Sequence, residues 1–281
     1  MSWRLQITHT TKYQYDSPVS QSYNEARLEP RSDRLQTVLS SRVEVEPATR
    51  VVRHVDYWGS VVHHFDVQVP HTELTVTGRA VVETATNAAD PGEVTWADLE
   101  AVEMRDRFEE LLVPTDRVAW DGELAEVAAE IRAASATPTE AAQAAVAWVN
   151  EHLEYRKGST GVRTTAAEVL ATGAGVCQDF AHLSLALLRP MGIPSWYVSG
   201  YLHPKKEAPL DEALLGESHA WVAAYTGTVW PLDPTSLSPV AERHVRVAAG
   251  RDYTDVSPFR GIYAGHTTQH LDVTVELIRK A

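Results

Sequence analysis

The single cysteine of the chain stands where a glycine-rich turn leads into a helical pattern. Cys177 follows Gly173-Ala174-Gly175-Val176, and apolar residues recur at positions 176, 180, 183, 187 and 188, before Pro190. This spacing predicts a helix that begins at Cys177. The positive end of a helix dipole favours a thiolate there, and the first N–H groups can bind an oxyanion. The pattern indicates a nucleophilic thiol, although an isolated cysteine is more often a small buried hydrophobe.

Two acid–base residues lie in a predicted β-hairpin further along the chain. His219 begins one predicted strand and Asp233 ends the next, with Thr226-Gly227-Thr228 as the turn between them. A turn centred on Thr226 pairs His219 directly with Asp233, and one centred on Gly227 places Asp233 diagonal to it on the same face. Either alone is an ordinary strand or turn residue. Together with a thiol at a helix start, they have the nucleophile, base and orienter types of a catalytic triad.

The elements that must position these residues divide the chain into three parts. Residues 1–85 show alternation with a period of two, as in Arg42-Val43-Glu44-Val45-Glu46, and predict an antiparallel β-sandwich with a hairpin turn at Tyr57-Trp58-Gly59-Ser60. Residues 86–120 are the predicted connecting segment, and residues 121–281 form the predicted catalytic core. The fold class that we expect is α+β.

Capping signals predict three helices ahead of the cysteine. Asp121 precedes apolar positions spaced by three and four, and Thr137-Pro138-Thr139-Glu140 opens a helix that extends to about His152. Thr165-Ala166-Ala167-Glu168 opens a short helix that ends before Gly173. These helices are expected to surround the cysteine helix.

Other segments complete the predicted core. The breaker cluster at 87–92 starts the connecting segment, and residues 193–202 are a predicted strand. Residues 203–216 are polar, and form either a lid over the site or a solvated connection, which we favour. Apolar residues alternate over 270–279 and predict a closing strand.

Composition excludes several classes of protein. The chain has 281 residues, of which 44% are hydrophobic, and 25 Lys and Arg against 38 Asp and Glu give a net charge of −13. This acidic balance argues against a nucleic-acid partner. One cysteine can form neither an intrachain disulfide nor a cysteine-based zinc site. We find no apolar run of about 20 residues and no signal-peptide pattern, so we expect no membrane association and a cytoplasmic location.

Four linked motifs occur in the second half of the chain: Gly175-Val176-Cys177-Gln178-Asp179-Phe180-Ala181-His182, Gly192-Ile193-Pro194 leading to Tyr197-Val198-Ser199-Gly200-Tyr201, Ser218-His219-Ala220-Trp221-Val222, and Asp233-Pro234-Thr235. Their order and separations of 42 and 14 residues between Cys177, His219 and Asp233 resemble the transglutaminase-like cysteine-protease superfamily. Arg27-Leu28-Glu29-Pro30-Arg31 and the tail at 250–258 resemble its bacterial two-domain type.

The resemblance implies a core in which the cysteine helix packs on an antiparallel sheet that bears His219 and Asp233. Cys177 would attack a peptide or carboxamide carbonyl, with His219 as base and then acid and Asp233 as its orienter. Water or an amine would resolve the acyl-enzyme, and we favour hydrolysis of a peptide or protein substrate over crosslinking. No cofactor or metal is required. The alternative is a non-catalytic module that binds peptides or proteins through its N-terminal β domain.

Further residues are weaker site candidates. Tyr155 is a candidate second oxyanion donor, and Gln178, Trp196 and Trp221 are candidate substrate contacts, although such aromatic residues are more often part of a core. Asp179 is expected to cap the cysteine helix, and His182 to point away from Cys177. His63 and His64 face opposite sides of a strand, which argues against a shared metal.

Overall fold

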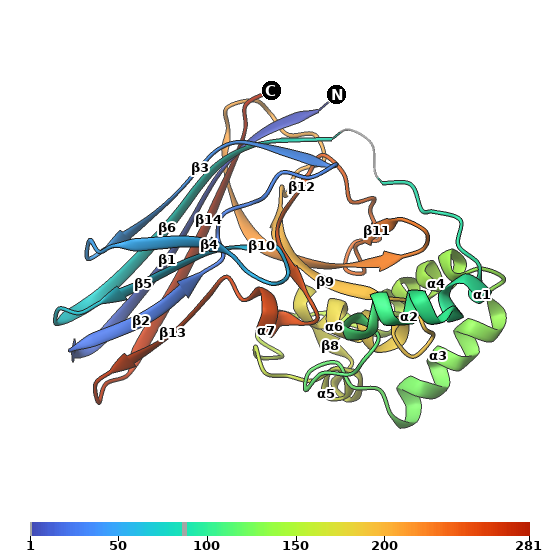
Figure 1. Ribbon diagram of the computed structural model, residues 1–281. Coiled ribbons are helices and arrows are strands. Elements are labelled where there is room, and N and C mark those ends of the chain that lie inside the picture. The colour runs from blue at the N-terminus through green and yellow to red at the C-terminus, as the bar shows by residue number, and fades with distance from the viewer. Residues whose placement is uncertain (1, 86–88) are drawn as a thin grey trace.

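The computed structural model describes residues 2–85 and 89–281. Its fold is α+β, as predicted: long strands form one end of the molecule and the helices gather at the other (Figure 1). Residues 86–88, which include the start of the predicted breaker cluster, lie outside the described residues.

One large antiparallel sheet runs through the molecule. Its strand order is β12-β9-β10-β14-β1-β6-β3, and β11 pairs with β10 beside this path. The bounds are β1 (Trp3–Val19), β3 (Gln36–Glu46), β6 (His71–Thr84), β9 (Ser195–Leu202), β10 (Ala213–Tyr225), β11 (Val229–Leu232), β12 (His244–Gly250) and β14 (Gln269–Arg279).

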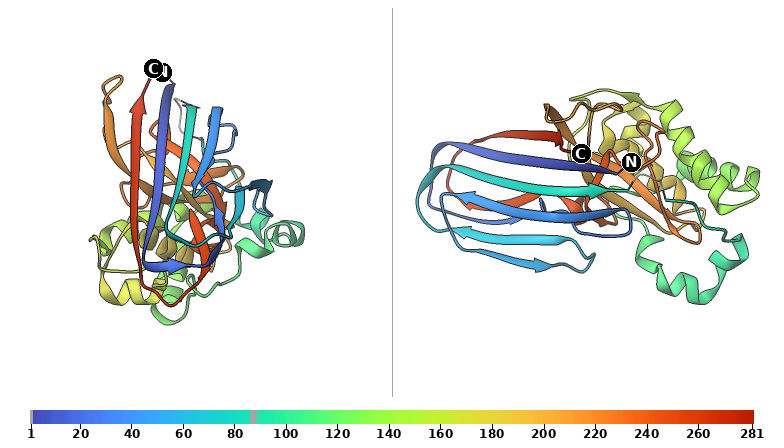
Figure 2. Two further views of the ribbon diagram at one scale, coloured as in Figure 1. Left: turned by 90° about the vertical axis from the view of Figure 1, so that its left-hand side faces the viewer. Right: turned by 90° about the horizontal axis from the view of Figure 1, so that it is seen from above.

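A second antiparallel sheet covers part of the first and completes the predicted N-terminal β domain. Its order is β13-β2-β5-β4, formed by β2 (Gln21–Ala26), β4 (Val51–Val55), β5 (Val61–Val67) and β13 (Phe259–Ala264). The two layers are visible in Figure 2. Their apolar faces bury a shared core that includes Tyr15, Leu28 and Phe65, as expected for a sandwich. The predicted hairpin turn joins β4 to β5, with Gly59 at a φ of +80°.

The motif at Arg27–Arg31, which follows β2, contacts the β4–β5 hairpin of the smaller sheet. The Arg27 guanidinium donates to Asp56 at 3.2 Å, and Glu29 receives hydrogen bonds from Arg53 and lies 3.2 Å from His63 Nε2. His63 is buried and its neighbour on β5 is exposed, so the two adjacent histidines face opposite sides, as predicted.

The last two strands of the chain join the N-terminal strands. β13 pairs with β2, and β14 lies between β1 and β10. The predicted closing strand is therefore present, and it connects strands of residues 1–85 with the strand that carries His219. The boundaries 1–85, 86–120 and 121–281 stay a prediction, but hydrogen-bonded pairing continues across them.

The helices pack mainly on one face of the β9–β10 part of the large sheet. Thr137 and Thr165 cap α4 and α5 as predicted, and α5 ends at Gly173 in the left-handed conformation. Within the described ranges, no helix has both the length and the apolar character needed to cross a membrane. The bounds are α1 (Trp96–Glu100), α2 (Val102–Arg107), η1 (Glu109–Leu111), α3 (Gly122–Ala134), α4 (Pro138–His152), α5 (Ala166–Thr172), α6 (Cys177–Leu188) and α7 (Tyr253–Val256).

The cysteine helix α6 is the centre of the core. Its residues from Asp179 to Leu188 are all buried, and it packs against α3, α4, α5 and strands β9 and β10. A helix that is covered on all sides has little freedom to shift. The position of its first residue is therefore fixed by packing rather than by the loop that precedes it.

A tight contact between strands at Gly200 gives a test of this scaffold. A Cβ atom at Gly200 would lie 2.1 Å from the Val245 carbonyl oxygen and 2.7 Å from the Trp221 ring, whereas one at Gly161 would meet nothing within 4 Å. Gly200→Ala is expected to lower the free energy of unfolding by roughly 1–3 kcal/mol, because β12 must move away. Urea unfolding measures this, with Gly161→Ala as the control. Equal stability of the two variants would contradict the prediction.

Candidate active site

Cys177 is the first residue of α6, as the sequence predicts. Two short parallel strands, β7 (Glu154–Tyr155) and β8 (Ala174–Gly175), lead into the helix. The buried Asp179 carboxylate accepts a hydrogen bond from the Val176 N–H at 2.7 Å and from the Thr160 hydroxyl at 2.5 Å. Asp179 therefore caps the helix that presents the thiol, as expected.

Gly175 has a structural role at this helix start. A Cβ atom there would lie 2.6 Å from Cβ of Asp179. At position 175 the close neighbour is the capping Asp179 side chain, so glycine is needed to pack the helix start.

His219 lies on a stretch of β10 that has a strand partner on one edge only. β14 pairs with Ala213–Gly216 and β11 pairs with Val222–Tyr225, whereas β9 covers the opposite edge from Glu217 to Ala224. Along Glu217–Trp221, none of the described strands covers the second edge. The His219 ring is thus held by a rigid strand. The Cys177 side chain is one of the groups that raise the pKa of this ring.

The hairpin after His219 has the register centred on Gly227. Val222 pairs with Leu232 and Tyr225 with Val229, and Gly227 has a φ of +103°. Of the two registers that the sequence allowed, this one places Asp233 diagonal to His219. The His219 Nε2 atom lies 3.0 Å from Asp233 Oδ2.

The Asp233 carboxylate is buried and satisfied on both oxygens. Oδ1 accepts the N–H groups of Thr235 at 2.9 Å and Ser236 at 3.3 Å, and Oδ2 accepts the Ser236 hydroxyl at 2.7 Å as well as His219. The turn after β11 therefore holds the carboxylate in place. Ser236 was not identified from the sequence, although an Asp that is followed by Pro, Thr and Ser is typical of such a turn.

The electrostatics of this pair favour the charged forms. Burial acts to lower the pKa of His219, but hydrogen bonds and charges from Asp233 and Cys177 outweigh it and raise the pKa to about 9. Burial acts to raise the pKa of Asp233, but hydrogen bonds from His219, His244 and Ser236 hold it well below its ordinary value. At neutral pH the ring is an imidazolium beside a carboxylate.

A second histidine, His244, reaches the same carboxylate. Its Nε2 atom lies 3.5 Å from Asp233 Oδ2, and its ring lies edgewise against Trp221 with centroids 5.3 Å apart. His244 was not found from the sequence, because only the pairing of β12 with β9 brings it here. Each of His219, Asp233 and His244 has one atom that could bind a metal, and these three atoms lie within 4.8 Å of one another. Because the carboxylate is already committed to hydrogen bonds, we interpret the cluster as a hydrogen-bonded network.

Tyr155, the candidate second oxyanion donor, lies on the short strand that leads into the start of the cysteine helix. It pairs with Gly175, and its ring packs near Phe180 with centroids 6.3 Å apart. Burial, together with the nearby negative charges of Cys177 and Glu217, raises the pKa of Tyr155 to about 12. The phenol therefore keeps its proton at neutral pH and remains a hydrogen-bond donor.

The other candidate residues are less close to the reacting groups. Gln178 turns its amide toward the Gly161 carbonyl oxygen at 3.5 Å. Trp221 is buried, and its ring centroid lies 6.0 Å from that of His219. Trp196 and Trp221 line a groove of about 350 Å³ together with Trp58. His182 is buried, and its Nε2 accepts the Tyr253 N–H at 3.2 Å, which fits its predicted structural role.

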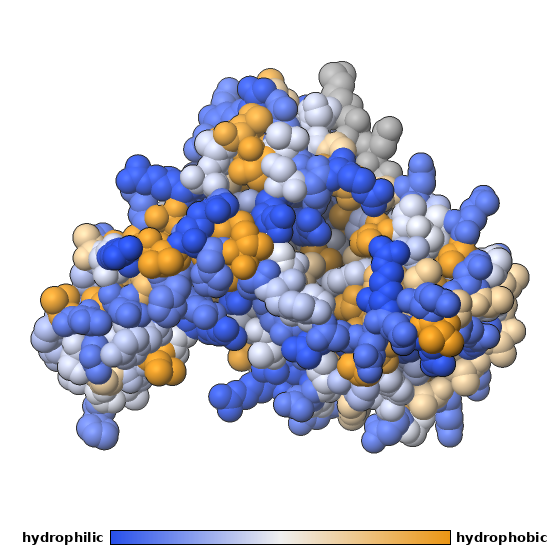
Figure 3. All heavy atoms as spheres, viewed as in Figure 1, coloured by the Kyte–Doolittle hydropathy of each residue, from blue (hydrophilic) through white to orange (hydrophobic). Residues whose placement is uncertain are grey.

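The surface around these elements is mostly polar. Figure 3 shows hydrophilic side chains over most of one face, with a hollow between the strands at the top of the view and the helical part. Grooves of this kind are where ligands bind most often.

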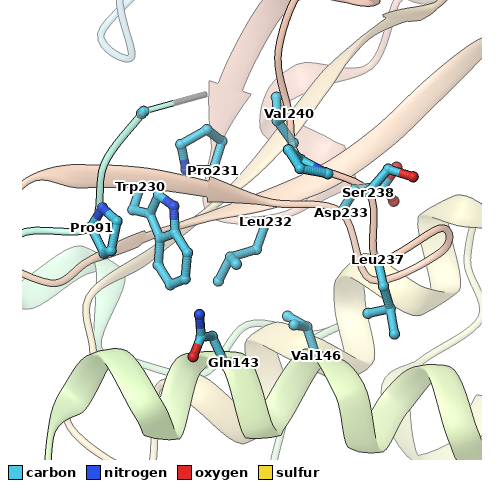
Figure 4. Close-up of a pocket in the computed structure, with 12 residues that line it drawn as sticks. Pro91, Gln143, Val146, Trp230, Pro231, Leu232, Asp233, Leu237, Ser238 and Val240 are labelled. Carbon is cyan, nitrogen blue, oxygen red and sulfur yellow. The ribbon is translucent and has the colours of Figure 1, made fainter. Parts of the chain in front are cut away.

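An apolar cavity of about 410 Å³ adjoins the carboxylate. It lies between α4, which contributes Gln143 and Val146, and β11 with the loop that follows, which contributes Trp230 and Leu237 (Figure 4). Asp233 is one of its lining residues but is itself 2% exposed. The apolar walls therefore limit the access of water to the carboxylate on this side.

The polar stretch 203–216 is partly a strand, which corrects its interpretation as a loop throughout. Residues Ala213–Gly216 belong to β10 and pair with β14, and Leu210 forms a bridge with Arg279. The periodic signal was weak because the side chains of this segment are mostly exposed. Its second half is thus tied into the sheet.

Comparison with protein families agrees with this geometry. A model of the transglutaminase-like superfamily matches residues 125–234, a range that includes Cys177, His219 and Asp233. A model of the bacterial transglutaminase-like N-terminal region matches residues 5–83. The chain belongs to the transglutaminase-like superfamily. The resemblance carried by the four sequence motifs is therefore confirmed.

Relatives and a solved structure extend over the whole length of this transglutaminase-like protein. The uncharacterized protein ML0607 of Mycobacterium leprae is 48% identical over 99% of this chain and 100% of its own. The uncharacterized protein Rv2569c of Mycobacterium tuberculosis is 32% identical over 98% and 92%. A crystal structure of a candidate cysteine protease from Cytophaga hutchinsonii has a TM-score of 0.76 at 21% identity, covering 100% of this chain and 98% of that one. This likeness shows a shared fold.

The raised pKa of His219 predicts how the stability of this transglutaminase-like protein depends on pH. A group whose pKa rises from 6.5 to about 9 on folding stabilises the protein below pH 6.5, and this contribution is lost as the pH rises through 9. Between pH 6.5 and 9 the wild type is expected to lose more free energy of unfolding than His219→Gln. Urea unfolding at both pH values measures the difference. Parallel losses in the two proteins would refute the prediction.

Proposed function

We propose that this protein is a cysteine-dependent hydrolase that acts on peptide or carboxamide bonds through an acyl-enzyme. The observation that carries the proposal is the pairing of His219 with the buried Asp233 carboxylate at 3.0 Å, in a site where the Cys177 side chain also raises the pKa of His219. Its order and chemistry match a nucleophile, its base and the orienter of that base. Membership in the transglutaminase-like superfamily supports an enzyme.

The proposed reaction begins with attack of the Cys177 thiolate on the carbonyl carbon. His219, protonated beside Asp233, gives its proton to the leaving amine as the C–N bond breaks, which leaves a thioester on the sulfur. Neutral His219 then takes a proton from water, whose oxygen attacks the thioester. The carboxylic acid leaves, and the thiolate–imidazolium pair is restored. Throughout, Asp233 keeps the ring in one tautomer and orientation.

We propose two groups as donors to the oxyanion. The N–H of Cys177 is at the first position of α6, where it has no partner within the helix. The Tyr155 hydroxyl keeps its proton at neutral pH, and its pKa is affected by the charge of Cys177. Donors fixed by a helix start and by a strand pair need little reorganisation during the reaction.

Transamidation would use the same acyl-enzyme, with an amine in place of water. The choice depends on access of the two acceptors to the thioester. We propose hydrolysis as the main outcome. Product analysis by mass spectrometry, with and without an added primary amine, would distinguish the two. A dominant amide product at low amine concentration would favour the transferase.

The reactivity of the thiol tests the proposed pair directly. Cys177 in the wild type is expected to react rapidly with iodoacetamide at pH 6–7, because the imidazolium of His219 stabilises the thiolate. His219→Ala should lose this reactivity at low pH. Cys177→Ala and His219→Ala should each reduce turnover of an amide substrate by roughly 10⁴-fold or more.

The matched control for this experiment is His270→Gln. His270 is exposed on β14, and its side chain is 72% accessible. This variant should behave as the wild type does. A thiol that reacts slowly and identically in the wild type and His219→Ala would reject the proposed ion pair and favour a binding role for the fold.

The role of Tyr155 can be separated from that of the thiol. Tyr155→Phe keeps the ring but removes the hydroxyl, and it should lower kcat/KM for an amide substrate by roughly 10²-fold. Alkylation by iodoacetamide forms no oxyanion, so its rate should stay close to that of the wild type. Tyr23→Phe, on the distant strand β2, serves as the control. A normal kcat/KM in Tyr155→Phe would remove Tyr155 from the oxyanion site.

A further inference from the structure

His244 is a buried residue that the catalytic scheme above does not use. It begins β12, its side chain is 3% exposed, and its Nε2 atom lies 3.5 Å from Asp233 Oδ2. The same oxygen lies 3.0 Å from His219 Nε2, and the two imidazole centroids are 6.1 Å apart. Asp233 therefore has a histidine on each of two neighbouring strands directed at one oxygen.

The environment of His244 determines its protonation state. Burial lowers the pKa of His244, and the positive charges of His219 and Arg243 act in the same direction, against the attraction of Asp233. The ring is therefore neutral at neutral pH. Within residues 2–85 and 89–281 neither of its nitrogens has a hydrogen-bond partner, so Nε2 is a buried, unsatisfied atom that faces Asp233 Oδ2 at 3.5 Å.

Only one tautomer of a neutral His244 is compatible with this position. If Nδ1 carried the proton, the lone pair of Nε2 would face a carboxylate oxygen, which is repulsive. With the proton on Nε2, the ring presents a donor to Asp233 Oδ2 across 3.5 Å, and a small movement of the ring is enough to close this distance to a hydrogen bond. Trp221, packed edgewise at 5.3 Å, holds the ring against rotation away from the carboxylate.

We propose that His244 is a positioning residue that shares the Oδ2 atom of Asp233 with His219, and so limits how firmly the carboxylate holds the proton on His219. This inference rests on the proposed function, because it concerns the acid–base residue of the same site. A carboxylate that serves a single imidazolium concentrates its charge on that ring. A second N–H donor spreads this charge.

Sharing the carboxylate has a chemical consequence for both halves of the reaction. His219 must release its proton to the leaving amine and must be neutral to activate water. A ring that holds its proton too firmly is a poor acid in the first step and is rarely a base in the second. The hydrogen bonds from Thr235 and Ser236 keep the carboxylate fixed, so His244 adjusts the charge of Oδ2 without being needed to anchor it.

The test compares two substitutions of similar size. His244→Gln keeps an N–H donor near the position of Nε2, and His244→Met fills the space without one. In ¹⁵N-histidine NMR titrations, the pKa of His219 should be higher in His244→Met than in the wild type, and close to the wild type in His244→Gln. The His219 signal is assigned by its loss in His219→Gln.

The kinetic readout is the hydrolysis of the acyl-enzyme. In His244→Met this step should be about fivefold slower at neutral pH, and its pH profile should move to higher pH. His244→Gln should stay within about twofold of the wild type. Equal rates and an unchanged pKa of His219 in both variants, or equal losses with an unchanged pH profile, would overturn the proposal and leave His244 a packing residue.

A measurement on the unchanged protein covers the case in which a variant does not fold. The ¹⁵N shifts of His244 should show a proton on Nε2, and a proton on Nδ1 would overturn the proposal. The titration of His219 can also be repeated in Cys177→Ala, where no catalysis occurs. A thiol that proves unreactive in the wild type would reject the proposed function, whereas the NMR result reports on the shared carboxylate independently.

Discussion

The buried carboxylate of Asp233 is the constraint on which the site depends. A charge removed from water is costly unless its hydrogen bonds are complete. Here the turn after β11 supplies two N–H groups and a hydroxyl, and the remaining capacity is directed at His219 and His244. One ionised group is therefore held in place by the turn after β11, by the register of the β10–β11 hairpin and by the start of β12. As a result, the imidazole next to it has a fixed orientation and a raised pKa.

The rest of the fold positions the Cys177 thiol, at the start of α6, relative to the His219 imidazole on β10. The helix α6 packs on one face of the sheet, whereas His219 lies on β10 where that strand has one free edge. Among the described strands, none pairs with the second edge of β10 along Glu217–Trp221, the stretch that contains His219. Buried packing fixes the helix, and backbone pairing fixes the strand. Neither relies on a flexible loop.

The sequence was sufficient to predict the family and most of the local structure, because those signals are short in range. The cap at Thr165 and the helix start at Cys177 are determined within a few residues, whereas the hairpin register stayed open between Thr226 and Gly227. Contacts between distant segments could not be predicted. His244 reaches Asp233 only through the pairing of β12 with β9, and β14, the last strand of the chain, pairs with β1, the first. The exposed strand at Ala213–Gly216 was missed because exposed residues leave no apolar pattern.

The central position of β14 in the large sheet has a consequence for how the protein folds. β14 is synthesised after every other strand, and yet β1 and β10 both need it as a neighbour. Until it emerges, these two strands present unpaired edges that can recruit other chains. Closing such a long loop also makes folding slow, since the entropy of closure must be overcome before the contacts form. The nascent chain is therefore most exposed to aggregation in the interval before its last strand docks, and the His219 strand gains its final support only at that point.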